Sequence, residues 1–223
     1  RGLGDVYKRQ GEKKWLDEFA VIAVIASLTA DVKRAYRLGA CDCFRLPFVT
    51  SILNHRIENA IATHEKEYRD YLTRAYNRRG FVYMVERFLN HCEDRTRYGI
   101  LYFNIKNFKA TNELLGVKEG DCILQSFCKS IERSFLHPVY TARVEADHFV
   151  SFVERDRISL KKLEEFCNQT FEIYNKKIRV HSCCGIFYLK DENMPVAGMV
   201  DRAKLAKQHI VDEYLKPYAC LLY

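Results

Sequence analysis

The pattern of apolar and polar positions divides the chain into two parts that meet near residue 70. Residues 19–27 are continuously apolar and β-branched, which is typical of a strand covered on both faces in a parallel sheet. Residues 31–38 suit a short helix with Gly39 as its stop, and residues 43–44 suit a second short strand. The first part is therefore predicted to have the order strand, helix, strand.

A longer helix is predicted over residues 50–68 and connects the two parts. Its residues Ile57, Ile61, His64 and Tyr68 follow a four-three-four spacing. This spacing is typical of a coiled coil, although the segment is too short to establish that it pairs with another helix.

Beyond residue 70 the spacing of apolar residues alternates between helical and strand periods. The predicted elements are a helix at 81–92, a strand at 100–105, a helix at 124–135, a hairpin of strands 139–144 and 148–153, a helix at 160–174, a strand at 178–189 and a helix at 197–211. Helices and strands interleave with a hairpin, which predicts an α/β (α+β) sheet domain of about 150 residues.

Composition is that of a soluble globular protein. Of the 223 residues, 48% are hydrophobic and 29% are charged. No apolar run approaches the roughly 18 residues that a transmembrane helix needs, and no signal peptide is recognisable. The formal net charge of +7 could help to hold phosphates or an acidic partner, although a solvated basic surface is the simpler interpretation. No basic patch is interleaved with aromatic residues, so nucleic-acid binding is not expected.

The nine cysteines do not form a recognisable metal or disulfide pattern. Cys41 and Cys43 form a C-x-C pair and Cys183 and Cys184 are adjacent, but no C-x-x-C occurs. A zinc site or a disulfide framework is therefore not expected, and a reducing cytoplasm is the predicted location. His137, His181 and His209 show no ligand spacing.

Three segments of the second part carry motifs in a characteristic order. Residues 70–81 read D-Y-L-T-R-A-Y-N-R-R-G-F, residues 103–109 read F-N-I-K-N-F-K, and residues 141–150 read T-A-R-V-E-A-D-H-F-V. They resemble, in turn, the D-x-L-T-x-L-x-N-R-R-x-F, D-I-D-x-F-K and R-x-G-G-[DE]-E-F motifs of GGDEF domains, which are diguanylate-cyclase-like. The resemblance implies a GGDEF domain over residues 70–219, with a central, mostly antiparallel sheet flanked by helices.

The first part is similar to the end of a response-regulator receiver domain. Residues 38–48 read L-G-A-C-D-C-F-R-L-P-F, which resembles the G-A-x-D-[YF]-x-x-K-P-F motif of receivers, with Leu46 at the position of the lysine. Ser27 is a candidate for the switch hydroxyl, and the phosphoacceptor aspartate would lie upstream. The resemblance implies the C-terminal part of a doubly wound receiver over residues 19–50, followed by a connecting helix at 51–69.

The two ends of the chain are set apart from these domains. Residues 1–18 are unassigned, and the first ten of them resemble translated adapter sequence. Residues 220–223 have the same character and are also treated as artefactual.

Active GGDEF domains join two GTP molecules into cyclic di-GMP, and the resemblance implies that Mg²⁺ is held by one acid on the first strand and one in the hairpin turn. Here Asn104 occupies the strand position, where its amide brings no negative charge, and Lys106 occupies the second acidic position. Asp147 keeps the first acidic position of the turn, whereas His148 replaces the glutamate before Phe149. Asp147 is thus a weak candidate metal ligand and Asn104 a lost one.

The two glycines of the family's turn are replaced by Glu145 and Ala146. A Gly-Gly turn allows the backbone to approach phosphates closely, and a β-carbon at each position would block that approach. The Glu145 carboxylate would in addition repel a triphosphate. The signature is therefore degenerate, and we expect cyclase activity to be lost.

Part of the nucleotide pocket is retained. Asn112 and Asp121 match the residues with which the family reads the guanine edge, and Lys109 matches its lysine near the phosphates. Alternatively, Asn112 and Asp121 only satisfy the local helix, with Asp121 as an N-cap. Val211 stands where the family has a phosphate-contacting lysine, and residues 136–139 lack the R-x-x-D motif of the family's product-inhibition site.

Three functions follow from the resemblance. The first is an inactive GGDEF domain in bacterial two-component or cyclic di-GMP signalling, which acts as a regulatory, GTP-sensing or dimerisation module. The second is an active diguanylate cyclase, and the third is a protein-interaction module without nucleotide. The first implies Mg²⁺ and GTP as the only candidate cofactors, a homodimer through the receiver and the connecting helix, and a downstream phosphodiesterase (EAL) domain or partner.

Overall fold

The computed structural model describes residues 22–25, 29–37, 40, 42–45, 47, 49–190, 194–210 and 216–221. The chain forms two compact units, Arg1–Glu67 and Tyr68–Tyr223. Among the described residues, no helix combines the length and the apolar character needed to cross a membrane.

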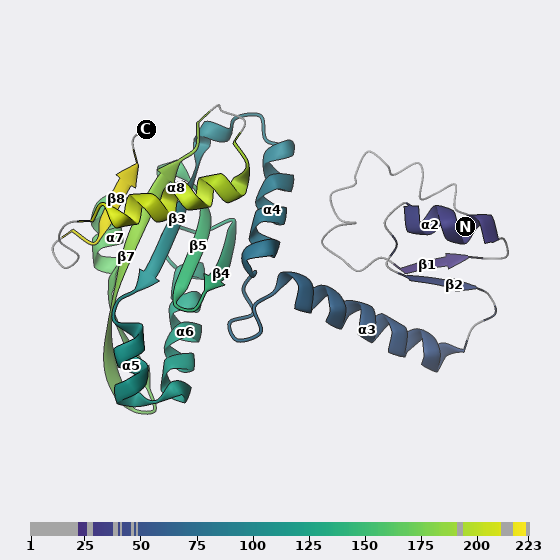
Figure 1. Cartoon of the computed structure of the whole chain (residues 1–223), viewed down its shortest axis with the longest axis horizontal. Helices are drawn as coiled ribbons and strands as arrows, with labels where there is room; N and C mark the ends of the chain where they lie inside the picture. Colours follow the sequence, from purple (N-terminus) through teal and green to yellow (C-terminus); the bar gives the residue numbers. More distant parts are fainter. Residues whose placement is uncertain are drawn as a thin grey trace. The chain divides into compact units, whose positions relative to one another are not determined.

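The first unit contains the predicted order of strand, helix and strand. Strands β1 (Ile22–Ile25) and β2 (Asp42–Arg45) pair in parallel, and helix α2 (Thr29–Arg37) lies between them in the chain (Figure 1). Helix α3 (Thr50–Tyr68) follows, as predicted. Gly39, Ser27 and Leu46 lie outside the described residues, so the features proposed for them remain predictions.

The second unit is built around a six-stranded sheet (Figure 1). Its elements are α4 (Arg78–Asn90), the short 3₁₀ helix η2 (Arg95–Arg97), β3 (Tyr98–Ile105), α5 (Phe108–Leu115), α6 (Val117–Glu132), β4 (Tyr140–Glu145), β5 (His148–Glu154), the 3₁₀ helix η3 (Arg155–Arg157), α7 (Leu160–Phe166), β6 (Asn168–Ile173), β7 (Lys176–Tyr188), α8 (Val196–Gln208) and β8 (Tyr218–Leu221). The strand order is β4-β5-β3-β7-β6, and β8 pairs with β7. Every pair is antiparallel except β7–β8, which confirms the mostly antiparallel sheet expected from the sequence.

Strand β3 lies in the middle of the sheet and is buried on both faces. Leu101 and Phe103 belong to an apolar cluster with Phe127 of α6, whereas Tyr102 belongs to a second cluster with α4 and α8. Helices therefore cover both faces of the sheet, which explains why β3 is almost continuously apolar.

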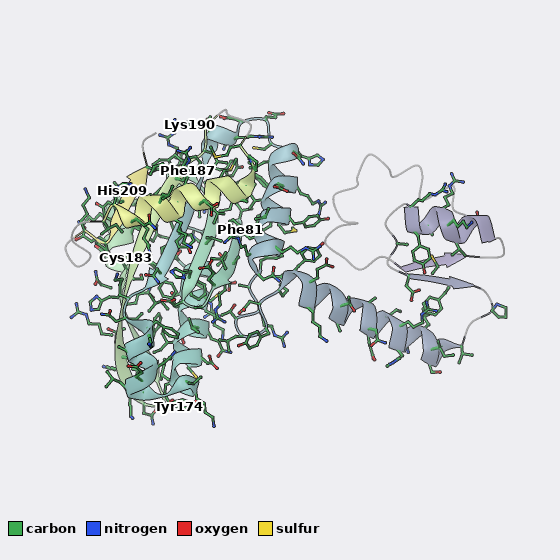
Figure 2. The ribbon with its side chains drawn as sticks, in the orientation of Figure 1. Phe81, Tyr174, Cys183, Phe187, Lys190 and His209 are labelled. Atoms are coloured by element: carbon green, nitrogen blue, oxygen red, sulfur yellow. The ribbon has the colours of Figure 1, made fainter. Side chains whose placement is uncertain are left out.

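Helix α8 crosses the sheet at Gly185 of β7. A β-carbon at Gly185 would lie 2.0 Å from the backbone oxygen of Ala203. Because only glycine allows this approach, the helix can lie directly against the strands that carry the site described below. Phe81 of α4 and Phe187 of β7 are packed in the same layer (Figure 2).

Residues 160–174 were predicted to be one helix, and that prediction is wrong for their second half. Helix α7 ends at Phe166, and β6 begins two residues later and forms a hairpin with β7. Tyr174 and Asn175 have φ angles of 50° and 62° at the hairpin tip (Figure 2), as a tight two-residue turn requires. Pairing with β7 overrides the helical pattern, which is a tertiary effect.

Smaller differences concern the ends of elements. Helix α5 was not predicted, and the β4–β5 turn has two residues, Ala146 and Asp147, where the predicted strand ends left three. Helix α6 begins at Val117, so Asp121 lies inside the helix and is not its N-cap. Cys220 and Leu221, which were set apart as adapter-like, pair with β7 in β8.

Candidate functional site

The first motif forms a turn that supports the β4–β5 hairpin. The Asp70 carboxylate accepts hydrogen bonds from the backbone nitrogen of Thr73 at 2.9 Å and from its hydroxyl at 2.8 Å. Arg143 lies with Nη1 3.3 Å from the same carboxylate, and the two side chains are only 12% and 14% exposed. Arg143 also donates from Nε to the backbone oxygen of Ala146 at 2.7 Å. These motif residues therefore hold the turn in place.

The same motif fastens the end of α3 to α4. Asn77 is the N-cap of α4 and accepts a hydrogen bond from the Gly80 nitrogen at 2.9 Å. Its own backbone nitrogen donates to the Tyr68 oxygen at 2.9 Å. A β-carbon at Gly80 would lie 2.3 Å from that oxygen, so the contact needs glycine. Tyr68, the last residue of α3 and the first residue of the second unit, is thus held in place within that unit.

Asn104 and Asp147 meet at the end of β3. Asn104 stands opposite His148 in the β3–β5 register, which places it beside the hairpin turn. Its side-chain nitrogen Nδ2 donates a hydrogen bond to Asp147 Oδ2 at 2.8 Å. The structure therefore brings together the two positions that the sequence identified as candidate metal ligands, and it links them directly.

Glu145 turns toward cationic residues of two helices. Its carboxylate lies 3.6 Å from Arg78 Nη1 of α4 and 3.5 Å from Lys204 Nζ of α8. Arg78 also reaches Asp201 of α8 at 3.4 Å. These ion pairs are partly exposed, so each contributes little stability alone. Together they place an acid and two cations at the first glycine position of the family's turn.

His148 is largely enclosed between the sheet and α8. Its ring lies 5.5 Å from the ring of Tyr102, and its Nδ1 is buried without a hydrogen-bond partner, 3.7 Å from Asp147 Oδ1. Burial lowers the pKa of His148, although the Asp147 and Glu145 carboxylates oppose that shift. The neutral imidazole is therefore the form that the folded site favours.

Two lysines lie close to the corner that Asn104, Asp147 and His148 form at the end of β3. Lys106 follows the last residue of β3 and donates from its backbone nitrogen to the His181 oxygen at 2.8 Å. Burial lowers the pKa of Lys207 of α8, and the charge of Lys106 lowers it further. The electrostatic character of the corner is thus set by ammonium groups as well as by Asp147.

Ala146 occupies the second glycine position of the turn with a φ angle of 21°. A positive φ brings the β-carbon close to the backbone, so an L-residue is strained there and glycine is not. The turn therefore has, at Ala146, a backbone conformation that favours glycine.

The retained nucleotide positions lie on α5 and α6. A β-carbon at Gly120 would lie 1.8 Å from Asn112 Oδ1, so the Asn112 side chain packs directly against α6 next to Asp121. Asn112 Oδ1 is buried and accepts no hydrogen bond. Lys109 is exposed, and its Nζ lies 4.0 Å from Glu113 Oε1. The structure thus brings Asn112 and Asp121 near each other. Val211 lies outside the described residues.

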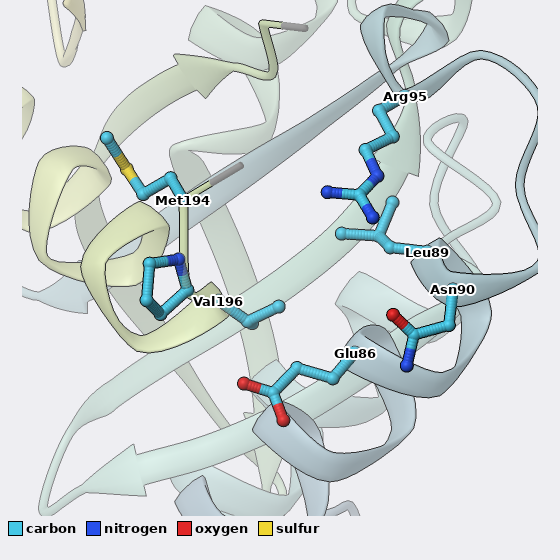
Figure 3. Close-up of a pocket in the computed structure, with 7 residues that line it drawn as sticks. Glu86, Leu89, Asn90, Arg95, Met194 and Val196 are labelled. Carbon is cyan, nitrogen blue, oxygen red and sulfur yellow. The ribbon is translucent and has the colours of Figure 1, made fainter. Parts of the chain in front are cut away.

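Two cavities accompany these residues. One, of about 340 Å³, lies between α4 and the start of α8 and is lined by Glu86, Leu89, Asn90, Arg95, Met194, Pro195 and Val196 (Figure 3). The other, of about 180 Å³, lies beyond the end of β3 and is lined by Ile105, Lys106, Asn107, Thr111, Ile123, Arg179, Val180 and His181. The sequence did not single out Arg179 or Thr111, because only folding brings β7 beside α5. Within the described part of the chain, no group of three or more His, Cys, Asp or Glu residues is arranged to hold a metal ion.

Comparison with known proteins gave a clear match for the second unit. A family model described as diguanylate cyclase, GGDEF domain, matches residues 67–209. Biofilm architecture maintenance protein MbaA of Vibrio cholerae is 34% identical over 89 residues, which are 36% of this chain and 11% of that protein. Bifunctional diguanylate cyclase/cyclic di-GMP phosphodiesterase MucR of Pseudomonas aeruginosa is 25% identical over 211 residues, which are 89% of this chain and 29% of that protein. The chain therefore spans less than a third of either curated relative.

Solved structures share the fold. The coiled coil and GGDEF domain of DgcB from Caulobacter crescentus, solved in complex with c-di-GMP, aligns with a TM-score of 0.62 and 18% identity, and the alignment covers 77% of this chain and 95% of that chain. The FimX GGDEF domain from Pseudomonas aeruginosa aligns with a TM-score of 0.52 and 16% identity, over 62% of this chain and 90% of that chain.

Proposed function

The chain belongs to the GGDEF family of diguanylate cyclase domains, and we propose that its own GGDEF domain has lost the cyclase reaction and serves as a regulatory module in a cyclic di-GMP signalling protein. The observation that carries this proposal is the hydrogen bond between Asn104 and Asp147. Two acids at these positions would repel each other unless a cation lay between them. An amide donor removes that need, because the Asp147 charge is satisfied by the protein itself.

The residues of this corner do not suit Mg²⁺. Mg²⁺ prefers an octahedral shell of hard oxygen ligands and is usually bound through one or two carboxylates plus substrate phosphates. Here Asp147 is engaged by Asn104, and Glu145 lies against Arg78 and Lys204. Lys106 adds a cation to the position of the family's second acid. We therefore assign no step to a metal ion in this chain.

The turn supports the same conclusion. The side chains of Glu145 and Ala146 fill the space that two glycines would leave open for a phosphate group. Ion pairs hold Glu145 in place between α4 and α8. A triphosphate would have to displace these contacts and approach a carboxylate.

The test is a cyclase assay on the whole chain. Purified protein is incubated with GTP and Mg²⁺, and cyclic di-GMP is measured by mass spectrometry, with an active GGDEF protein as the positive control. We expect no product. Product above the no-enzyme background would overturn the proposal and show that Asn104 and the Glu145-Ala146 turn are compatible with the reaction.

A matched variant makes a negative result informative. Restoring the family residues with Asn104→Asp, Lys106→Asp, Glu145→Gly, Ala146→Gly and His148→Glu should create Mg²⁺ binding that calorimetry detects and that the natural chain lacks. Equal Mg²⁺ binding by both proteins would contradict our account of the site.

GTP sensing is a second candidate, and Asn112 favours it. A buried carbonyl oxygen without a donor is energetically costly, and a guanine ring nitrogen could supply the missing donor. A ligand that binds only the native state raises its melting temperature. We expect GTP to raise it in the natural chain and not in Asn112→Ala, whereas no shift in either protein would leave a protein-interaction module.

Regulation would act through the connecting helix. We propose that the chain forms a homodimer through the receiver-like unit and α3, and that a downstream phosphodiesterase (EAL) domain or partner receives the output. A signal from α3 would pass through Tyr68, which ends α3 and belongs to the second unit, where its backbone oxygen accepts a hydrogen bond from the Asn77 nitrogen. Unchanged output after disruption of Tyr68 would contradict this route.

A further inference from the structure

We propose that the outer edge of strand β6 is an interaction surface on which a second copy of this chain adds its own β6 as an antiparallel strand. The proposal does not rest on the loss of catalysis, because β6 (Asn168–Ile173) lies at the opposite end of the strand order from β4 and its turn. It is also separate from the homodimer proposed through α3, which uses a different element of the chain.

The β4 edge and the β6 edge of the sheet differ in how the chain covers them. At the β4 edge, Tyr76 donates from its backbone nitrogen to the Thr141 oxygen at 3.2 Å and accepts from the Arg143 nitrogen at 2.9 Å. At the β6 edge, none of the strands that the structure describes pairs with the outer side of β6. An open edge presents a row of backbone groups that can pair with another chain.

The hydrogen-bonding phase of the β6–β7 hairpin decides which backbone groups point outward. The Ser182 nitrogen donates to the Cys167 oxygen at 2.8 Å, so these two residues, which continue the β6–β7 register, form a hydrogen-bonded pair. Hydrogen-bonded and non-hydrogen-bonded pairs alternate along an antiparallel ladder. Asn168, Thr170 and Glu172 therefore form non-hydrogen-bonded pairs with β7, and their backbone N–H and C=O groups point to the open edge.

The sequence of β6 lacks the features that usually protect an open edge. Proteins protect such edges with proline, lysine or a bulge. Strand β6 reads N-Q-T-F-E-I and pairs with β7 over all six residues without a register shift. The side chains of Thr170 and Glu172 are exposed, and residues such as Thr170 and Phe171 favour strand pairing. The edge is therefore suited to accept another strand.

The edge is complementary to a second copy of itself. In an antiparallel pair centred on Thr170, Thr170 faces its own copy and Asn168 faces Glu172 of the second copy. This register pairs all the outward groups and gives about six hydrogen bonds, because each facing pair exchanges two. Any other register that keeps outward groups facing each other pairs fewer of them. The resulting interface is two-fold symmetric and uses the same patch on both copies.

The charge pattern of β6 favours the same register. The Asn168 side-chain nitrogen has two N–H groups and donates one of them to the Glu164 backbone oxygen at 3.1 Å. The other can donate to the Glu172 carboxylate of the second copy, which lies directly opposite on the same face of the sheet. A register centred on Glu172 would instead place two carboxylates opposite each other. The occupant that fits this edge is therefore a second copy, paired about Thr170.

Hydrogen exchange tests the proposal on the whole chain. Amide exchange is followed by NMR at rising protein concentration, because a small interface gives weak association that depends on concentration. We expect the N–H groups of Thr170 and Glu172 to exchange about tenfold more slowly in the associated state, whereas those of Gln169 and Phe171 are protected at every concentration by their bonds to β7. A dimer formed only through α3 leaves the outward groups open to exchange. Exchange of these groups that is independent of concentration would therefore overturn the proposal.

A proline variant with a matched control tests the backbone pairing. Thr170→Pro removes the central outward N–H group and no hydrogen bond to β7, whereas Thr170→Val keeps that N–H group and the β-branched shape. In sedimentation velocity we expect about tenfold weaker association for Thr170→Pro and less than about a twofold change for Thr170→Val. Circular dichroism checks that both variants are folded. Equal association of both variants and the natural chain would contradict pairing at this edge.

A pair of charged variants tests the register and does not depend on the proline variant. Because residue 170 faces its own copy, Thr170→Glu and Thr170→Lys should each associate about two- to fivefold more weakly than the natural chain. An equimolar mixture of the two variants should recover the association, because a carboxylate then faces an ammonium group. A mixture that associates no better than either variant alone would overturn the two-fold pairing about Thr170.

Discussion

Two corners of the GGDEF domain contain residues of the family's motifs, and they have changed in opposite ways. The corner formed by Asp70, Thr73 and Arg143 keeps the family's residues and is held by hydrogen bonds and a largely buried ion pair. The corner formed by Asn104 and Asp147 has an amide at the position where the family motif has an acid, and the two side chains form a hydrogen bond with each other. Under the function proposed above, the chain retains the residues that the fold requires and differs at positions that the reaction requires.

The largest expected effect on stability comes from removing the ion pair between Asp70 and Arg143. Arg143→Ala leaves the Asp70 carboxylate without its ionic partner in a site that is about nine-tenths enclosed, and loss of one member of such a pair costs about 3 kcal/mol. Urea denaturation measures the change in the free energy of unfolding. The control is Arg157→Ala, which removes an exposed pair with Glu154 and should cost less than about 1 kcal/mol. Similar losses in both variants would mean that the buried corner has no special role.

A smaller effect is expected from restoring an acid in the changed corner. Asn104→Asp replaces the donor to Asp147 with a second carboxylate, so we expect a loss of about 2 kcal/mol in the absence of divalent ions. Mg²⁺ should recover part of this stability in the variant and leave the natural chain unchanged, as thermal melting with and without Mg²⁺ would show. A natural chain that gains as much stability from Mg²⁺ as the variant does would be incompatible with a self-satisfied corner.

The folded protein should become more stable when glycine replaces Ala146 in the β4–β5 turn. Ala146 has a φ angle of 21°, and relief of that strain by Ala146→Gly should outweigh the added freedom of the unfolded chain by about 0.5–1 kcal/mol. Chemical denaturation would measure this gain. Loss of stability would show that the Ala146 methyl group packs favourably in the turn.

The smallest effect is a dependence of stability on pH. Burial lowers the pKa of His148 below its ordinary value of 6.5, so the unfolded chain binds a proton more readily than the folded one. The contribution is fully present above pH 6.5 and is lost as the pH falls through the folded-state pKa. We expect His148→Phe to flatten the stability curve in that range; an unchanged curve would place the titrating group elsewhere.

Sequence reasoning succeeded where a pattern was long or a motif was complete. The apolar run of β3 and the amphipathic face of α4 were found because their periods extend over several residues. It was wrong for residues 168–173, because their short, partly polar pattern becomes a strand only when β7 is available to pair with it. It missed the cavity at β3 because Lys106 and Arg179 are more than seventy positions apart in the chain.

The sequence by itself determined the family, the mostly antiparallel sheet and the substitutions at Asn104, Glu145 and Ala146, because residue identity and spacing carry that information. Only the tertiary structure decided how the substituted residues are satisfied. It showed that Asn104 donates to Asp147 and that Glu145 lies between Arg78 and Lys204. Hydrogen bonds and ion pairs depend on distance and direction, and these are set by how strands and helices distant in sequence pack together.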